Sequence, residues 1–181
     1  STESLRAWAE IDLKAIRANV TLLLGFAGEQ TGVLGVVKAD AYGHGLIPVA
    51  QAVVEAGAVW LGVATAAEGV ALRESGLTAP IALLCAALPQ EAEEIVQYGL
   101  TATVGDRALL DALAREAEFQ HKSVSLHLEI ETGMGRSGVL PEEAVALWKT
   151  AVAQGLCVTG LTTHFADADG LETDFTREQA A

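Results

Sequence analysis

Short apolar runs alternate along the chain with longer segments whose apolar residues recur at helical spacing. The runs are bounded by glycine, proline or other turn residues, which is typical of buried strands. The predicted strands span residues 33–37, 61–64, 81–85, 101–104, 125–130 and 158–164. The predicted helices span residues 13–24, 47–56, 66–75, 90–98, 106–117 and 141–153.

Strands that are continuously apolar and alternate with helices predict an α/β fold, in which helices cover a parallel sheet. The sheet is either a barrel or an open, doubly wound layer, and five consecutive strand–helix steps favour a (β/α)8 TIM-type barrel. Such a barrel typically takes about 250 residues. We therefore expect the 181 residues to contain a barrel truncated after about six strands.

The first segment does not fit the strand–helix repeat. The stretch AWAEIDL alternates like a strand, yet it precedes the first predicted helix. We therefore predict two parts. Residues 1–12 contain an N-terminal strand that pairs with an element outside this sequence, and residues 13–181 form the incomplete barrel.

Composition narrows the classes of partner and the compartment. Eleven Lys and Arg residues against 24 Asp and Glu residues give a formal charge of -13, which disfavours nucleic acid and anionic membrane surfaces as partners. No apolar stretch approaches the roughly 18 residues of a membrane span. The N-terminal residues have no signal-peptide pattern, and Cys85 and Cys157 form no disulfide framework. We expect a cytoplasmic protein.

If the fold is a barrel, functional residues should lie on loops at the C-terminal ends of its strands. Lys38, Leu84, Arg136 and His164 all fall at or just after such an end. This convergence indicates an enzyme, and we expect no metal site in it.

Lys38 follows the first predicted strand, inside the stretch VVKADAYGHG. A partly desolvated amine binds its proton less tightly, so Lys38 is a candidate to attack a carbonyl group and form a Schiff base. Tyr42 can hydrogen-bond a phosphate oxygen, and Gly43 and Gly45 let the backbone of this glycine-rich loop approach a ligand closely. The alternative is that the lysine extends its head group into solvent.

The stretch LHLEIETGMGRSG supplies a second group of candidates. Strand alternation places His127, Glu129 and Glu131 on one face. Glu129 is placed to hold the guanidinium of Arg136, which can then bind a phenolate or a carboxylate. The alternative is a structural ion pair at the barrel rim. His164 either stacks on a cofactor ring or is a hydrogen-bonded core histidine.

These motifs, together with AWAEIDLKAIRANV at the start and THFADAD near the end, resemble the alanine racemases, which are fold-type III pyridoxal-phosphate enzymes. The resemblance covers essentially the whole chain. It implies a pyridoxal 5'-phosphate-dependent isomerase that interconverts L- and D-alanine through an aldimine and a Cα carbanionic intermediate. It also implies a homodimer with shared active sites.

The resemblance gives residues 13–181 the role of binding pyridoxal phosphate, with Lys38 as the Schiff-base lysine and one of two catalytic bases. Tyr42 would be a phosphate-side ligand, and His164 would stack against the pyridine ring. The remaining roles are implied in the same way: Leu84 lines the pocket, Arg136 contacts the phenolic oxygen of the cofactor, and Arg136 and Met134 contact the substrate.

In many relatives the position of Glu129 is a lysine that becomes carbamylated and supplies a negative charge to the arginine. Glu129 provides an anion without carbamylation, and we expect it to position Arg136. The resemblance places a phosphate cup and an arginine at the pyridine nitrogen in strands beyond Ala181. It also places there a β-domain that pairs with residues 1–12 and supplies a tyrosine, the second base, to the other subunit. We expect the 181 residues to be inactive alone.

Three alternatives stay open at this point. One is a racemase of serine or of broader amino-acid range on the same scaffold. Another is a non-catalytic barrel that binds pyridoxal phosphate. The third is a chain that ends at Ala181 in the cell and exposes sheet edges that need a partner.

Overall fold

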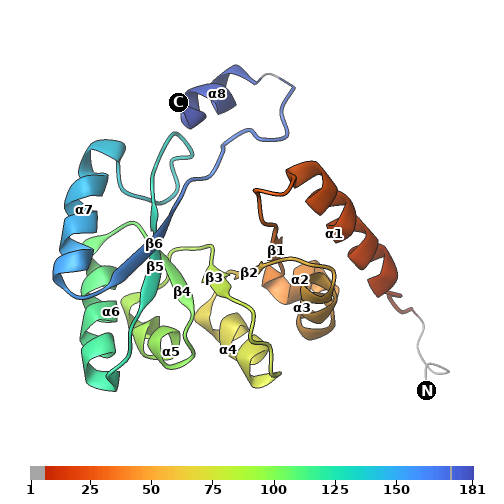
Figure 1. The fold of residues 1–181 in the computed structure, drawn as a ribbon, viewed down its shortest axis with the longest axis horizontal. Helices are drawn as coiled ribbons and strands as arrows, with labels where there is room; N and C mark the ends of the chain where they lie inside the picture. The colour runs from red at the N-terminus through yellow and green to blue at the C-terminus, as the bar shows by residue number, and fades with distance from the viewer. Residues whose placement is uncertain (1–6, 172) are drawn as a thin grey trace.

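The computed structural model describes residues 7–171 and 173–181. Six parallel strands form one sheet in the order β1-β2-β3-β4-β5-β6, and helices cover its outer face (Figure 1). This order has no reversal, which is typical of a barrel wall rather than a doubly wound sheet. The predicted α/β class is confirmed. The strands are β1 (Leu34–Val36), β2 (Trp60–Val63), β3 (Ile81–Leu83), β4 (Thr101–Val104), β5 (Ser125–Glu129) and β6 (Cys157–Thr162).

The helices lie close to their predicted positions, and two further ones were not predicted. Asp12 is the N-cap of the first helix, and its carboxylate accepts hydrogen bonds from the backbone N–H groups of Lys14 and Ala15. Pro141 occupies the first turn of its helix, as predicted. The helices are α1 (Leu13–Ala27), α2 (Lys38–Gly43), α3 (Leu46–Glu55), α4 (Ala66–Glu74), α5 (Ala92–Gln97), α6 (Arg107–Gln120), α7 (Pro141–Ala153) and α8 (Asp174–Ala180), with a 3-10 turn at Pro89–Glu91. Those not predicted are α2 and α8.

The core lies between the sheet and its helices. Alternate strand residues such as Leu61, Leu83 and Leu126 are fully buried there. Residues of the opposite parity face the inner side of the sheet, where Trp60 and His127 lie with their ring centroids 5.2 Å apart. Burial lowers the pKa of His127, so this histidine is a neutral packing residue at neutral pH. The strand alternation thus separates a core face from an inner face.

The segment after β1 is not the glycine-rich loop that the sequence predicts. It is one left-handed turn, in which residues 39–42 have φ between 51° and 55°. Left-handed conformations cost roughly 1–2 kcal/mol per residue for residues other than glycine, so surrounding contacts must hold the turn. Ala41 N–H donates to Val37 O at 2.8 Å, and Leu46 N–H donates to the Asp40 carboxylate at 2.7 Å. The sequence did not reveal this conformation, because none of these residues is one that favours it strongly.

The N-terminal segment forms neither helix nor strand at residues 7–12. Residues 1–6 lie outside the described part of the chain, so the assignment of residues 1–12 to a separate domain stays a prediction. Within the described residues, no helix is long and apolar enough to span a bilayer.

Candidate active site

The C-terminal strand ends converge on a cavity of about 250 Å³. The residues around it come from the ends of five of the strands and from the segments that follow them. Six of these were predicted from the sequence: Lys38, Tyr42, Leu84, Glu129, Arg136 and His164. The remaining lining residues are Val36, Thr103, Thr162 and Thr163. Met134 is not among the described residues that line the cavity, and its predicted contact with substrate stays a prediction.

Lys38 is placed at the cavity by the strand that precedes it. Val37 is fully buried, and its N–H donates to Gly62 O of the neighbouring strand at 2.8 Å. The left-handed turn begins immediately after the lysine, so the direction of the chain changes at Lys38 itself. The lysine is half-buried at the cavity wall, where its amine can meet a ligand.

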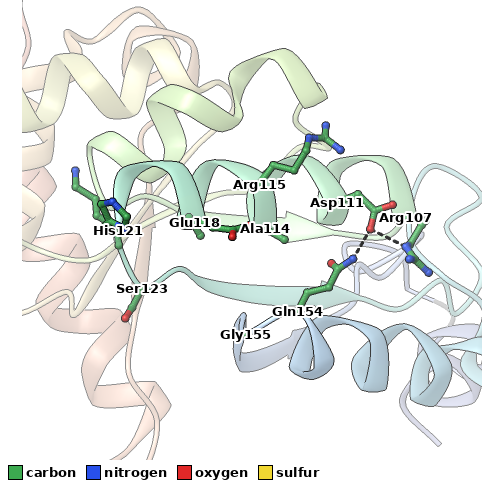
Figure 2. Close-up of a pocket in the computed structure, with 11 residues that line it drawn as sticks. Arg107, Asp111, Ala114, Arg115, Glu118, His121, Ser123, Gln154 and Gly155 are labelled. Atoms are coloured by element: carbon green, nitrogen blue, oxygen red, sulfur yellow. Dashed lines mark hydrogen bonds and ion pairs between the residues drawn. The ribbon is translucent and has the colours of Figure 1, made fainter.

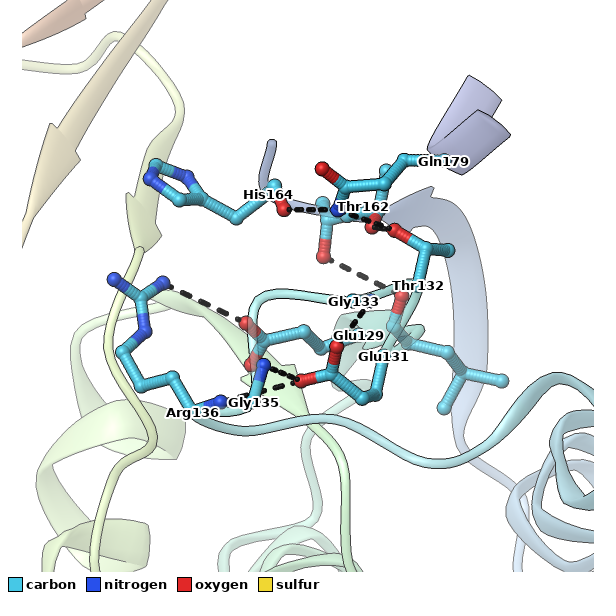
Figure 3. Close-up of polar contacts among 11 residues, drawn as sticks. Glu129, Glu131, Thr132, Gly133, Gly135, Arg136, Thr162, His164 and Gln179 are labelled. Carbon is cyan, nitrogen blue, oxygen red and sulfur yellow. Dashed lines mark hydrogen bonds and ion pairs between the residues drawn. The ribbon is translucent and has the colours of Figure 1, made fainter. Parts of the chain in front are cut away.

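Glu129 and Arg136 approach each other at the cavity, as predicted. Oε1 of Glu129 lies 3.8 Å from Nη2 of Arg136 (Figure 3). The glutamate is 6% exposed, whereas the arginine side chain is 42% exposed. The second carboxylate oxygen of Glu129 and the hydroxyl of Thr103 are both buried, and neither has a hydrogen-bond partner among the residues that the structure describes. A buried polar atom without a partner costs about 1–3 kcal/mol, so both atoms are placed to accept or donate to a ligand.

Glu131 organises the loop that carries Arg136. It lies beyond the end of β5, so it does not share the inner face with Glu129 as the strand alternation predicted. Its carboxylate instead accepts the backbone N–H groups of Gly133 and Gly135, the latter at 2.7 Å, and that of Arg136 at 3.2 Å (Figure 3). These hydrogen bonds, led by the one from Gly133, hold the pKa of Glu131 below its ordinary value.

We expect the loop to open when the Glu131 carboxylate is protonated. A group with a lowered folded-state pKa contributes stability above its ordinary value, and this contribution is lost as pH falls through the folded-state value. The amide resonances of Gly133 and Gly135 should therefore titrate together, with a midpoint below that of an ordinary glutamate. NMR spectra across the acidic range would test this. Amides that do not move until global unfolding would contradict it.

A buried glutamine connects the loops that carry Arg136 and His164. Gln179 lies on α8, and its Nε2 donates to the hydroxyl of Thr132 and to His164 O, both at 3.2 Å. Its Oε1 accepts the N–H of Ala166 at 2.9 Å. Figure 3 shows the His164 ring and the Arg136 side chain projecting to the same side of the two strand ends. Thus α8, which was not predicted, ties the last two strand ends together.

The cavity residues that the sequence analysis missed are mainly threonines. Thr103 is the polar residue near the end of the buried strand β4, and Thr162 ends β6. A polar side chain of inner-face parity at a strand end was the available signal.

A larger groove of about 800 Å³ lies elsewhere, between α6 and the C-terminal end of α7 (Figure 2). Asp111 accepts hydrogen bonds there from Arg107 Nε at 2.7 Å and from Gln154 Nε2 at 2.6 Å. The charge of Asp111 is thus paired with that of Arg107. The groove lies on the outer helical layer, whereas barrel active sites lie at the C-terminal strand ends. The smaller cavity is therefore the candidate site. Within the described residues, no group of acidic, histidine or cysteine side chains could hold a metal ion.

Comparison with known proteins identifies relatives along nearly the whole chain. The family described as "Alanine racemase, N-terminal domain" matches residues 11–181. An alanine racemase of Halothermothrix orenii is 43% identical over 95% of this chain and 46% of its own length. The crystal structure of an alanine racemase from Bacillus anthracis with bound L-Ala-P has a TM-score of 0.88, with 32% identity, over 96% of this chain and 45% of that one. An alanine racemase of Clostridium difficile 630 in complex with cycloserine has a TM-score of 0.89, also with 32% identity, over 98% and 49%. The chain thus spans about half the length of these relatives.

Proposed function

Because the chain belongs to the family of alanine racemase N-terminal domains, we propose that the protein containing it interconverts L- and D-alanine with the aid of pyridoxal 5'-phosphate. The observation that carries this proposal is the meeting of Lys38, Arg136 and His164 at one strand-end cavity. These are the residues to which the sequence motifs assign the chemistry. They come from β1, β5 and β6 or the segments after them, so only the folded sheet brings them together.

The cavity residues fit pyridoxal phosphate by their chemistry. An aldehyde requires an amine, which Lys38 supplies, and a phenolate requires a cation, which Arg136 supplies. The unpaired Thr103 hydroxyl at the cavity wall can hydrogen-bond a polar group of the cofactor or substrate. Tyr42, whose side chain lines the cavity and remains mostly exposed, is proposed to contact the phosphate.

Each residue has a separate proposed task. When bound, pyridoxal phosphate withdraws electrons from the substrate and acidifies its Cα–H bond. Lys38 would hold the cofactor through its Nζ and would move the proton at Cα on one face of the substrate. Arg136 would bind the substrate carboxylate, and Met134 would contact the substrate. His164 would stack on the cofactor ring.

Two further residues would shape the site without touching the reacting proton. Leu84 follows β3 and would line the apolar wall of the pocket. Glu129 is buried beside Arg136 and would hold the guanidinium in its binding direction. The negative charge of Glu129 also offsets the positive charge of Arg136, so that the two side chains together add no net charge to the cavity.

Racemisation needs a proton donor on the face of Cα opposite Lys38. Tyr98 does not meet this need, because its hydroxyl donates to Glu74 Oε1 at 3.4 Å on the helical layer. We infer that the second base is a tyrosine of the other subunit of a cytoplasmic homodimer. The support for the second base, the dimer and the compartment is the family resemblance.

Alanine is the substrate favoured by the comparisons, since the Bacillus anthracis relative was solved with bound L-Ala-P. The full-length protein should therefore racemise L-alanine and incorporate solvent deuterium at Cα in D₂O. Chiral chromatography and mass spectrometry would follow both events, with L-serine as the competing substrate. Faster turnover of L-serine would contradict the proposed specificity. Cofactor bound to Lys38 without exchange at Cα of either amino acid would instead indicate a binding protein.

A further inference from the structure

Glu68, in the first turn of α4, contacts the left-handed turn at residues 39–42, which follows Lys38 in the neighbouring strand–helix unit and is called the lysine turn below. Its Oε1 accepts the backbone N–H of Ala39, the residue after Lys38, at 2.7 Å. Its Oε2 accepts the N–H groups of Ala64 at 2.8 Å and of Thr65 at 3.4 Å. One carboxylate thus binds the start of α4 and the start of the left-handed turn at once.

Only part of this arrangement is explained by helix capping. Thr65 and Glu68 form a capping box, in which the Thr65 hydroxyl accepts the Glu68 N–H at 3.3 Å. A capping box needs the glutamate to reach only its own N-cap residue. The bond to Ala39 spans 29 residues of sequence and satisfies the first N–H of the left-handed turn. A charged acceptor makes this a short, strong hydrogen bond.

The start of α4 is itself fixed by the next unit along the sheet. Glu91, just before α5, accepts the N–H of Leu88 at 2.7 Å and that of Ala66, the first residue of α4, at 3.2 Å. The carboxylates of Glu91 and Glu68 therefore connect three segments in series: the 3-10 turn after β3, the start of α4 and the turn after Lys38. Glu68 is the member of this series that contacts the lysine turn.

We propose that Glu68 is a positioning residue for Lys38, an inference that rests on the proposed function of this lysine. The Ala39 peptide group is joined directly to the Lys38 carbonyl, so fixing its N–H fixes the direction in which the Lys38 side chain leaves the backbone. The left-handed conformation of residues 39–42 is unfavourable without such contacts. Removal of the Glu68 carboxylate leaves the Ala39 N–H to water and lets the lysine sample other directions.

Glu68→Gln and Thr65→Ala separate positioning from capping in the full-length protein. Thr65→Ala removes the capping hydroxyl and should lower the melting temperature. Glu68→Gln keeps a residue type that can complete a capping box, but its amide has one acceptor oxygen where the carboxylate uses one oxygen for Ala39 and the other for Ala64 and Thr65. Two measurements follow. Hydrogen exchange of the Ala39 amide is recorded by NMR without cofactor. The rate at which borohydride fixes added pyridoxal phosphate to Lys38 is recorded by peptide mass spectrometry.

We expect Glu68→Gln to speed exchange of the Ala39 amide about tenfold and to slow labelling of Lys38 about tenfold, as for the loss of one charge-assisted hydrogen bond. Thr65→Ala should leave both rates at the wild-type value. If Glu68→Gln does not fold, Glu68→Asp serves as the test. Its shorter side chain keeps the charge in the first turn but does not reach Ala39, so the same two changes are expected.

The outcomes distinguish this inference from the proposed function. Normal labelling of wild-type Lys38 with unchanged rates in the Glu68 variants would overturn the positioning role alone. Equal effects of Thr65→Ala and Glu68→Gln on labelling would also overturn it, because capping would then explain both. A wild-type protein whose Lys38 takes no label would overturn the proposed function, and the inference with it.

Discussion

The Lys38→Ala variant of the full-length protein is expected to lose about 10⁴-fold in racemisation rate, the upper range for removal of a general base. The loss is large because one amine has two proposed tasks, holding the cofactor and moving the Cα proton. No other lysine among the described residues lines the cavity.

Racemisation kinetics and borohydride labelling test this expectation together. Lys149→Ala is the matched control, since Lys149 is an exposed lysine on α7, remote from the cavity in sequence and fold. The control should keep wild-type turnover and should carry the label at Lys38. A Lys38→Ala protein that still racemises alanine at more than a few per cent of the wild-type rate would refute the assignment of Lys38.

The positions of the strands and of most helices were predictable because the spacing of apolar residues reports which segments are buried. Apolar runs such as 61–64 and 81–85 must be buried in a folded chain, and the helix at Pro141–Ala153 has a proline at its start and a glycine after its end. The cavity residues were predictable from their position after these runs. Parallel strands bring their C-terminal ends to one edge, so Lys38 and His164 were expected on the same edge of the sheet, where both line the cavity.

The conformation of the loops was not predictable in the same way. The left-handed turn depends on the Glu68 carboxylate, which comes from another strand–helix unit, and no local pattern reports such a contact. Glu131 was assigned to the inner face because the alternation of β5 was extended past its end at Glu129. Its carboxylate is used by three backbone N–H groups that only the folded loop brings near. Hydrogen bonds from side-chain carboxylates to backbone N–H groups, tertiary at Glu68 and local at Glu131, therefore determine what the pattern of apolar residues leaves open.

Glu129 is the residue whose substitution should most affect Arg136. A glutamate that is 6% exposed, with one oxygen 3.8 Å from Nη2 of Arg136, supplies the negative charge facing the guanidinium. Glu129→Gln keeps the shape but removes this charge, and turnover should fall about 10- to 100-fold, as for hydrogen bonds to charged groups. Glu129→Lys places a like charge there, and the loss should be about 10³-fold, in the range for breaking a buried ion pair.

The lysine variant also provides a recovery test. Its ammonium group can lose one proton, and the free amine can then react with carbon dioxide to form a carbamate and release a second proton, which turns the cation into an anion facing Arg136. Added bicarbonate should therefore restore much of the turnover of Glu129→Lys and leave that of Glu129→Gln unchanged. Kinetics with and without bicarbonate, with intact mass to detect the carbamate, would show this. Full activity of Glu129→Gln would mean that Arg136 needs no buried anion. The direction of the Arg136 side chain would then depend only on the loop that the Glu131 carboxylate holds.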